Sequence, residues 1–167
     1  MGSQRGGYPL QGLLSLREGE ARERAASLGA AREALEEARK AVARASEALQ
    51  GWEREVSLFR EQARAWRALG CDLGSLQEEA AQEDALLREL GGARRRAQEA
   101  QTWEEAARRG ELEAQAAWEE ASRGVEAARR HKEAWEEGRR RAALAREEDE
   151  LEERSVHAWA TGRGERG

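Results

Sequence analysis

The chain has 167 residues, of which 38% are charged and only 5% are aromatic, and its formal net charge is −5. So few large apolar side chains exclude a thick globular core, and the interleaved charges lack the basic excess of a dedicated nucleic-acid binder. The composition instead favours an all-α protein that is built from long helices.

Cysteine content and hydropathy limit the classes of protein further. Cys71 is the single cysteine, so no internal disulfide can form, which fits a reducing compartment. The sequence has no run of about 18 apolar residues, so we expect no insertion into a membrane, and its start lacks the apolar stretch of a secretory signal. The polar, Gly-rich residues 1–8 and 161–167 are expected to be flexible.

A helix over residues 9–69 is the first predicted element. Counted in sevens from Leu14, and again from three residues later, every position from Leu28 to Trp66 is apolar. A strict period of seven makes a helix supercoil around a partner helix. Such a helix would be roughly 90 Å long at 1.5 Å per residue.

Residues 70–92 form a predicted tip segment. The stretch GCDLGS, residues 70–75, contains two glycines and should end the first helix. Ser75 and Glu78 have the spacing of a capping box, which predicts a short helix over residues 76–90. The pair Gly91 and Gly92 should then interrupt the helix. Cys71 has no histidine close in sequence, so we do not expect it to act as a nucleophile.

The last predicted helix covers residues 93–160. Its positions in sevens from Ala93, and those three residues later from Arg96, are mostly Ala and Gly. Small residues opposite large ones let two helices approach closely, and we interpret Gly110, Gly124 and Gly138 as room for large side chains. Residues 9–160 should therefore form a monomeric, long two-helix antiparallel coiled-coil hairpin with a short helical tip segment.

Catalytic and metal-binding patterns are missing from the sequence. It has no phosphate-binding Gly-rich loop and no zinc motif. Its only histidines are His131 and His157, and His131 falls on the predicted seam, where we expect it to be packed. We therefore predict neither enzyme activity nor a metal or cofactor.

The six tryptophans are numerous for a chain with one Tyr and one Phe. Five of them are expected on or beside the helix seam: Trp52, Trp66, Trp103, Trp118 and Trp135. Trp159 lies close to the end of the last helix, where packing partners run out. An exposed Trp at that position is a plausible binding anchor.

Several leucines do not fit the heptad seam. Leu13 and Leu16 fall off it at the start of the first helix, and Leu144 and Leu151 fall off it near the end of the last helix. Antiparallel pairing predicts that these two groups gather at one end of the hairpin. An end that is apolar on several faces should insert into a partner.

Three segments give the chain a resemblance to the FliJ/YscO family, the central-stalk proteins of type III secretion systems. Residues 8–40, YPLQGLLSLREGEARERAASLGAAREALEEARK, look like the family's N-terminal pattern of an aromatic, paired leucines and Leu-Arg-Glu. FREQARAWRAL, residues 59–69, is similar to the aromatic-Trp-Arg segment of YscO-like members. HKEAWEEGRRRAALAREEDELEER, residues 131–154, looks like their C-terminal basic and acidic stretch. Trp135 stands where Leu or Phe is expected, which leaves the choice between flagellar and injectisome systems open.

The resemblance implies a non-enzymatic protein at the cytoplasmic face of a membrane-bound secretion apparatus. It would couple a hexameric export ATPase to the export gate protein, and secretion chaperones are partners of some members. The residues expected to bind the ATPase lie at the open end of the hairpin: Leu10, Leu13, Leu14, Leu16, Arg17, Leu144, Leu151, Val156 and Trp159. Gate contacts are assigned to Trp52, Phe59 and Trp66 from their aromatic character. The alternative is a generic coiled-coil scaffold or tether that forms a homodimer.

Overall fold

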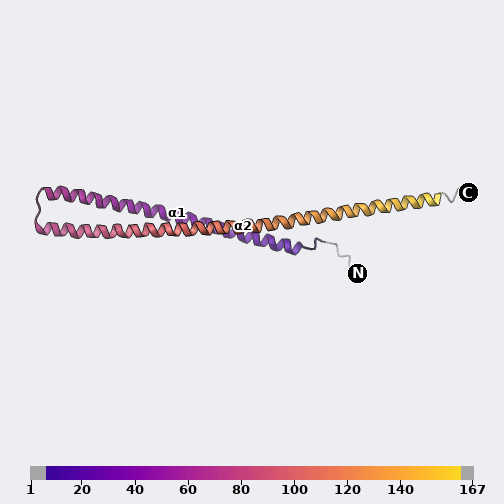
Figure 1. Cartoon of the computed structure of the whole chain (residues 1–167), viewed down its shortest axis with the longest axis horizontal. Helices are drawn as coiled ribbons and strands as arrows, with labels where there is room; N and C mark the ends of the chain where they lie inside the picture. Colours follow the sequence, from indigo (N-terminus) through magenta and orange to yellow (C-terminus); the bar gives the residue numbers. More distant parts are fainter. Residues whose placement is uncertain (1–6, 163–167) are drawn as a thin grey trace. The chain divides into compact units, whose positions relative to one another are not determined.

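Two long helices make up the computed structural model, which describes residues 7–162. They are α1 (Gln11–Ala68) and α2 (Leu73–Gly162), shown in Figure 1. The chain divides into a turn unit, Ala25–Ala117, and a terminal unit, Met1–Arg24 with Trp118–Gly167. Each unit is an antiparallel pair of helical segments, which confirms the predicted all-α hairpin. The expected flexibility of residues 1–6 and 163–167 concerns positions outside the described residues.

Residues 69–72 connect the helices within the turn unit. The backbone N–H groups of Leu69 and Gly70 donate to the carbonyls of Trp66 and Arg67 at 3.0 and 3.1 Å. Gly70 has a φ of 89°, which strains any residue with a Cβ. The Asp72 carboxylate then accepts the Ser75 N–H at 2.9 Å, and the Ser75 hydroxyl and N–H lower the pKa of Asp72. Asp72 is therefore the cap of α2, three residues before the predicted cap.

Helix α2 is continuous through Gly91 and Gly92, so the predicted short helix over 76–90 and its break are wrong. Leu90 and Ala93, on either side of the glycine pair, are 6% and 1% exposed. Each glycine costs a helix about 1 kcal/mol relative to Ala. Burying the flanking residues against α1 in a continuous helix outweighs that penalty.

Burial along α1 in the turn unit follows the predicted heptads. Leu28, Leu35, Ala38, Val56 and Ala63 are buried, whereas most positions between them are exposed. A period of seven therefore describes α1 correctly, and its seam holds mainly large side chains.

The seam of α2 differs from the prediction by one position in each heptad. Ala93 and Ala100 are buried as expected, but the second buried series begins at Ala97, four residues after Ala93, and not at Arg96. Trp103, which was expected on the seam, is 48% exposed. Residues three and four positions further along a helix both lie close to the same face. Here burial of the small apolar Ala97 costs less free energy than burial of the charged Arg96.

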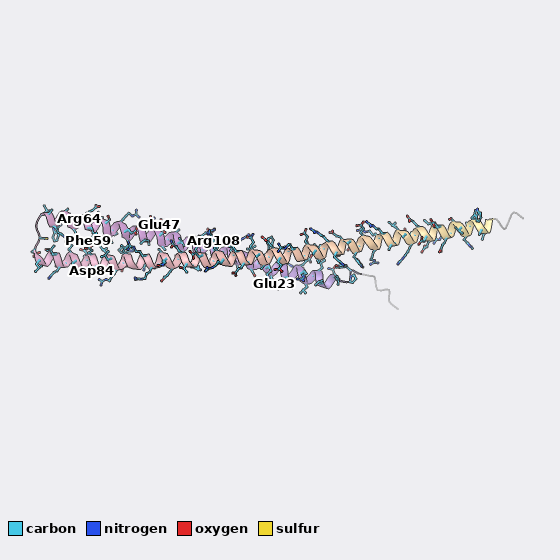
Figure 2. All side chains as sticks on the ribbon, in the orientation of Figure 1. Glu23, Glu47, Phe59, Arg64, Asp84 and Arg108 are labelled. Atoms are coloured by element: carbon cyan, nitrogen blue, oxygen red, sulfur yellow. The ribbon has the colours of Figure 1, made fainter. Side chains whose placement is uncertain are left out.

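Ion pairs between the helices give the direction of pairing in the turn unit. Their residue numbers fall along α1 as they rise along α2: Arg67–Glu79, Arg60–Glu83, Arg39–Glu104 and Arg32–Glu111. The glutamates are less exposed than the arginines, as in the last pair with 17% against 60%. Other charged side chains, such as Glu47, Arg64 and Arg108, are exposed on the two helices (Figure 2).

Candidate functional site

In the terminal unit, the start of α1 lies along the middle of α2. Arg129 donates from Nη2 to Oε1 of Glu18 at 2.8 Å, and Nζ of Lys132 donates to Oε1 of Gln11 at 3.1 Å. Leu14, which lies between Gln11 and Glu18 on α1, and Val125, one turn before Arg129 on α2, are buried, at 5% and 8% exposure. The first turn of α1 is therefore opposite Lys132.

Tyr8 closes this pairing from the segment that precedes α1. Its hydroxyl lies 2.7 Å from Nδ1 of His131, and its ring meets the Trp135 ring edge-on at 5.5 Å between centroids. The N–H of Gln11 donates to the Tyr8 carbonyl at 3.1 Å, which joins the segment to the helix. Tyr8 is only 8% exposed. The prediction that Tyr8 belongs to a flexible N-terminus was therefore wrong. Burying an aromatic ring gives a favourable free energy that the Gly-rich composition of residues 1–8 does not reveal.

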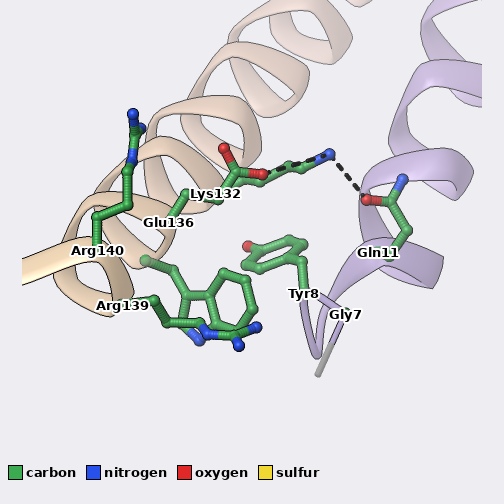
Figure 3. A pocket seen from close by; sticks show the side chains of 8 residues that line it. Gly7, Tyr8, Gln11, Lys132, Glu136, Arg139 and Arg140 are labelled. Carbon is green, nitrogen blue, oxygen red and sulfur yellow. Dashed lines mark hydrogen bonds and ion pairs between the residues drawn. The ribbon is translucent and has the colours of Figure 1, made fainter. Parts of the chain in front are cut away.

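A surface hollow of about 790 Å³ lies beside this aromatic contact, shown in Figure 3. Trp135 and Tyr8 supply its aromatic surface, and the guanidinium carbon of Arg139 lies 4.9 Å from the centroid of the Trp135 ring. This distance is that of a cation–π contact. The residues that line the hollow are Gly7, Tyr8, Gln11, Lys132, Trp135, Glu136, Arg139 and Arg140.

Beyond the hollow, α2 continues as a single helix. Every side chain from Glu137 to Thr161 is exposed, and four of them are large and apolar. Those four are 58–65% exposed: Leu144, Leu151, Val156 and Trp159. We call residues 142–161 the α2 extension, because the described part of α1 does not cover them.

The α2 extension changes the predicted arrangement of the off-seam leucines. Leu13 and Leu16 lie on the first turns of α1, between Gln11, which contacts Lys132, and Arg17, which reaches Gly124. Leu144 is twelve residues beyond Lys132, which is roughly 18 Å along the helix. The predicted single apolar end is therefore wrong, since α2 extends past the start of α1 and separates the two groups.

The remaining predicted site residues differ in their exposure. Leu10, Leu13 and Leu16 are 43%, 44% and 59% exposed, whereas Leu14 is buried on the seam and presents no surface to a partner. Arg17 pairs with Glu20 at 3.2 Å.

Gly124 is the one of the three seam glycines that a large side chain closely approaches. A Cβ at Gly124 would lie 3.8 Å from Cδ of Arg17. This position therefore agrees with the interpretation that the seam glycines leave room for large side chains. A Cβ at Gly110 or Gly138 would have nothing within 4 Å. Of the aromatic residues assigned to the gate, Trp52 and Phe59 are half-buried and Trp66 is 47% exposed.

Sequence reasoning missed two features. The first is Tyr8, the only Tyr of the chain, which stands directly before its only Pro. An aromatic next to a helix start is a signal that could have indicated a packing role. The second is the pair Leu69 and Leu73, which flank the turn at 85% and 72% exposure. Their only signal was that leucines border a Gly-rich turn.

The described residues offer neither a metal site nor a membrane span. Within residues 7–162, no group of three or more His, Cys, Asp or Glu side chains could hold a metal ion. Neither described helix is long and apolar enough to cross a membrane.

Comparison with known proteins gives one informative likeness. No protein-family model and no curated sequence matches the chain. A solved structure does match it: CT670 of Chlamydia trachomatis, a proposed homolog of YscO, with a TM-score of 0.82. The alignment covers 95% of this chain and 98% of that one, at 16% sequence identity. Because the identity is low, the likeness concerns the fold, and the chain has a YscO-like fold.

Proposed function

We propose that this chain is a central-stalk component of a type III protein export apparatus, which couples a hexameric export ATPase to the membrane export gate. Two independent observations support the proposal. The fold matches that of a proposed YscO homolog over 95% of the chain, and the chain itself carries the heptads and end leucines of such a stalk. The role is one of binding, and the chemistry of hydrolysis belongs to the ATPase.

The observation that carries the ATPase contact is the α2 extension. This stretch of α2 is not covered by the described part of α1, yet it carries four large apolar side chains that are 58–65% exposed: Leu144, Leu151, Val156 and Trp159. Exposed apolar side chains grouped in this way are typical of interaction surfaces. Leu144 and Leu151 are seven residues apart, so they share a helix face, and Trp159 lies within about 80° of Leu151 at 100° per residue.

Such a surface suits a shaft inside a ring. A single chain cannot match the symmetry of six identical subunits, so its contacts must be modest and must shift between subunits. A single helix with a narrow apolar face and mixed charges offers contacts of this kind. Leu10, Leu13 and Leu16 would add a second apolar contact at the start of α1.

The gate and chaperone contacts belong to the same proposal. Trp66 is the most exposed of the three aromatic residues assigned to the gate, so it should provide most of that contact. Trp52 and Phe59 are half-buried and would mainly support the helix pair. The site of action would be the cytoplasmic face of the export apparatus.

The test mixes the full chain with the hexameric type III export ATPase of the same genome. Size-exclusion chromatography with light scattering then measures whether the two form a complex. The double variants Leu13→Glu/Leu16→Glu and Leu144→Glu/Leu151→Glu should each weaken binding about tenfold or more, because they place charge in apolar contacts. The matched control is Leu58→Glu/Leu112→Glu, which alters leucines of similar exposure, 50% and 59%, in the turn unit. Full binding by both end variants would refute the assigned contact.

The same measurement separates the stalk from the alternative scaffold. A stalk should elute with the mass of one chain, 18.6 kDa, and a homodimeric tether with twice that mass. A stable dimer that ignores the ATPase would favour the scaffold.

A further inference from the structure

We propose that the hollow between the Gly7–Leu10 segment and α2 binds an acidic peptide segment that carries an aromatic or large apolar side chain. The proposal concerns a site apart from the leucines of the α2 extension. It rests on the shape and charge of the hollow and holds whether or not the chain is an export stalk.

The floor of the hollow is aromatic. Tyr8 and Trp135 meet at an interplanar angle of 63°, so the two rings form a concave corner and not a flat stack. Trp135 is only half-buried, which leaves part of its apolar surface open to the hollow. An edge-to-face third ring or a branched aliphatic side chain would cover that surface favourably.

The rim of the hollow is cationic. Lys132, Arg139 and Arg140 line it together with a single carboxylate, Glu136, which leaves a net charge of +2. Lys132 lies 4.0 Å from Glu136 and so neutralises it. Arg140 makes no ion pair with any residue between 7 and 162. Carboxylates of a bound segment would therefore meet the Arg140 guanidinium, which pairs with no carboxylate among the described residues.

The pattern of charges around the hollow favours a peptide over a nucleic acid. A single-stranded nucleic acid is held by a cationic groove that follows successive phosphates. Here the third neighbouring arginine, Arg141, pairs with Glu137 and does not line the hollow. Further along α2, residues 147–150 are all acidic and would repel a continuing phosphate backbone. A short segment with carboxylates on both sides of one apolar anchor fits the local charge better.

The test uses the full chain labelled with ¹⁵N and follows its tryptophan indole signals. The probe is the peptide acetyl-Asp-Glu-Phe-Glu-Asp-amide, and Trp135→Phe identifies the Trp135 signal by its loss. The peptide should shift the Trp135 signal in a saturable way and leave the Trp52 and Trp66 signals unchanged. Added salt should weaken binding, because the contacts are charged and open to solvent. The same peptide with Ala in place of Phe should bind more weakly.

Matched variants locate the binding. Arg139→Glu/Arg140→Glu should weaken the peptide affinity about tenfold or more, because it reverses both charges at the rim. The control Arg130→Glu/Arg141→Glu makes the same charge change at α2 arginines that do not line the hollow, and it should bind normally. Circular dichroism establishes that both variants remain helical.

Four results would overturn the proposal. They are a Trp135 signal that does not move, equal binding of acetyl-Lys-Lys-Phe-Lys-Lys-amide, equal loss of affinity in both double variants, and tighter binding of oligothymidylate than of the acidic peptide. The last result would assign the hollow to single-stranded nucleic acid. Because neither the probe nor the variants involve the ATPase or the end leucines, failure here leaves the proposed function standing.

Discussion

The hydroxyl of Tyr8 lies 2.7 Å from Nδ1 of His131, although 123 residues separate them in the sequence. This hydrogen bond and the edge-on contact with Trp135 tie the segment before α1 to the middle of α2. Together with Gln11 and Lys132, the contact sets where the two helices stop running side by side.

Replacement of Tyr8 should loosen the terminal unit. Tyr8→Ala removes a buried ring and should destabilise the pairing by about 2 kcal/mol or more, while Tyr8→Phe keeps the ring and should cost about 1 kcal/mol for the lost hydrogen bond. Hydrogen exchange of the amides of residues 11–24 measures the effect. Unchanged protection in Tyr8→Ala would show that the contact does not hold the first turns of α1.

The contact between Arg67 and Glu79 should make stability depend on pH. Arg67 Nε donates to Oε2 of Glu79 at 3.1 Å, and hydrogen bonding from Arg67 lowers the pKa of Glu79 below its ordinary 4.5. The folded state therefore favours the ionised carboxylate. Its contribution should be complete above pH 4.5 and disappear as the pH falls through the lower folded pKa.

Urea denaturation of the wild type and Glu79→Gln at several pH values tests this expectation. The wild type should be more stable at pH 7, and the two midpoints should converge in acid. Glu78→Gln removes the same charge at an exposed neighbouring position and serves as the control. A difference between wild type and Glu79→Gln that stays constant from pH 7 into acid would contradict the assigned role of Glu79.

Alanine at Gly91 or Gly92 should stabilise the protein by about 1 kcal/mol each, because both positions are in the interior of α2. The added Cβ atoms would lie 3.8 Å from Nη1 of Arg95 and 3.6 Å from Nη1 of Arg96, which are ordinary contacts with flexible side chains. Gly70→Ala should instead destabilise by about 1–2 kcal/mol, because its φ is positive. Thermal denaturation followed by circular dichroism measures all three, and a destabilised Gly91→Ala would indicate a helix break after all.

Truncation after Arg141 should remove helix content without lowering stability. Every described side chain of the α2 extension is exposed, so its loss deletes no buried side chain of the described residues. The urea midpoint should stay within about 0.5 kcal/mol of the full chain in free energy, while the circular dichroism signal falls. Export ATPase binding should be lost together with the extension. A lower midpoint would mean that the extension packs against the rest of the protein.

The heptads of α1 could be predicted because burial there follows a strict period. Leu28, Leu35 and Val56 are seven or a multiple of seven residues apart, and all three are buried. On α2 the series of small residues left open which position forms the second buried series, three residues after Ala93 or four. Partner geometry and the cost of burying Arg96 decided between them, and neither quantity can be read from the spacing of one helix.

The glycines also show that local sequence preferences do not determine the structure where tertiary packing opposes them. The turn at Gly70 ends α1, as the Gly-rich composition of residues 70–75 indicates, whereas Gly91 and Gly92 remain helical. The difference lies in the burial of Leu90 and Ala93, which helix propensity does not include. Local preferences of about 1 kcal/mol yield to tertiary packing wherever the two disagree.

Spacing and composition were sufficient to predict two long helices and their antiparallel pairing. They also predicted leucines off the seam at the start of the first helix and near the end of the last. Where those leucines lie depended on the tertiary structure, because the register of α1 against α2 sets how far α2 continues alone. Tyr8, His131 and Trp135 determine that register at the start of α1 through a hydrogen bond and a ring contact between residues far apart in the chain. A hollow with an aromatic floor and a cationic rim exists only once those side chains have met.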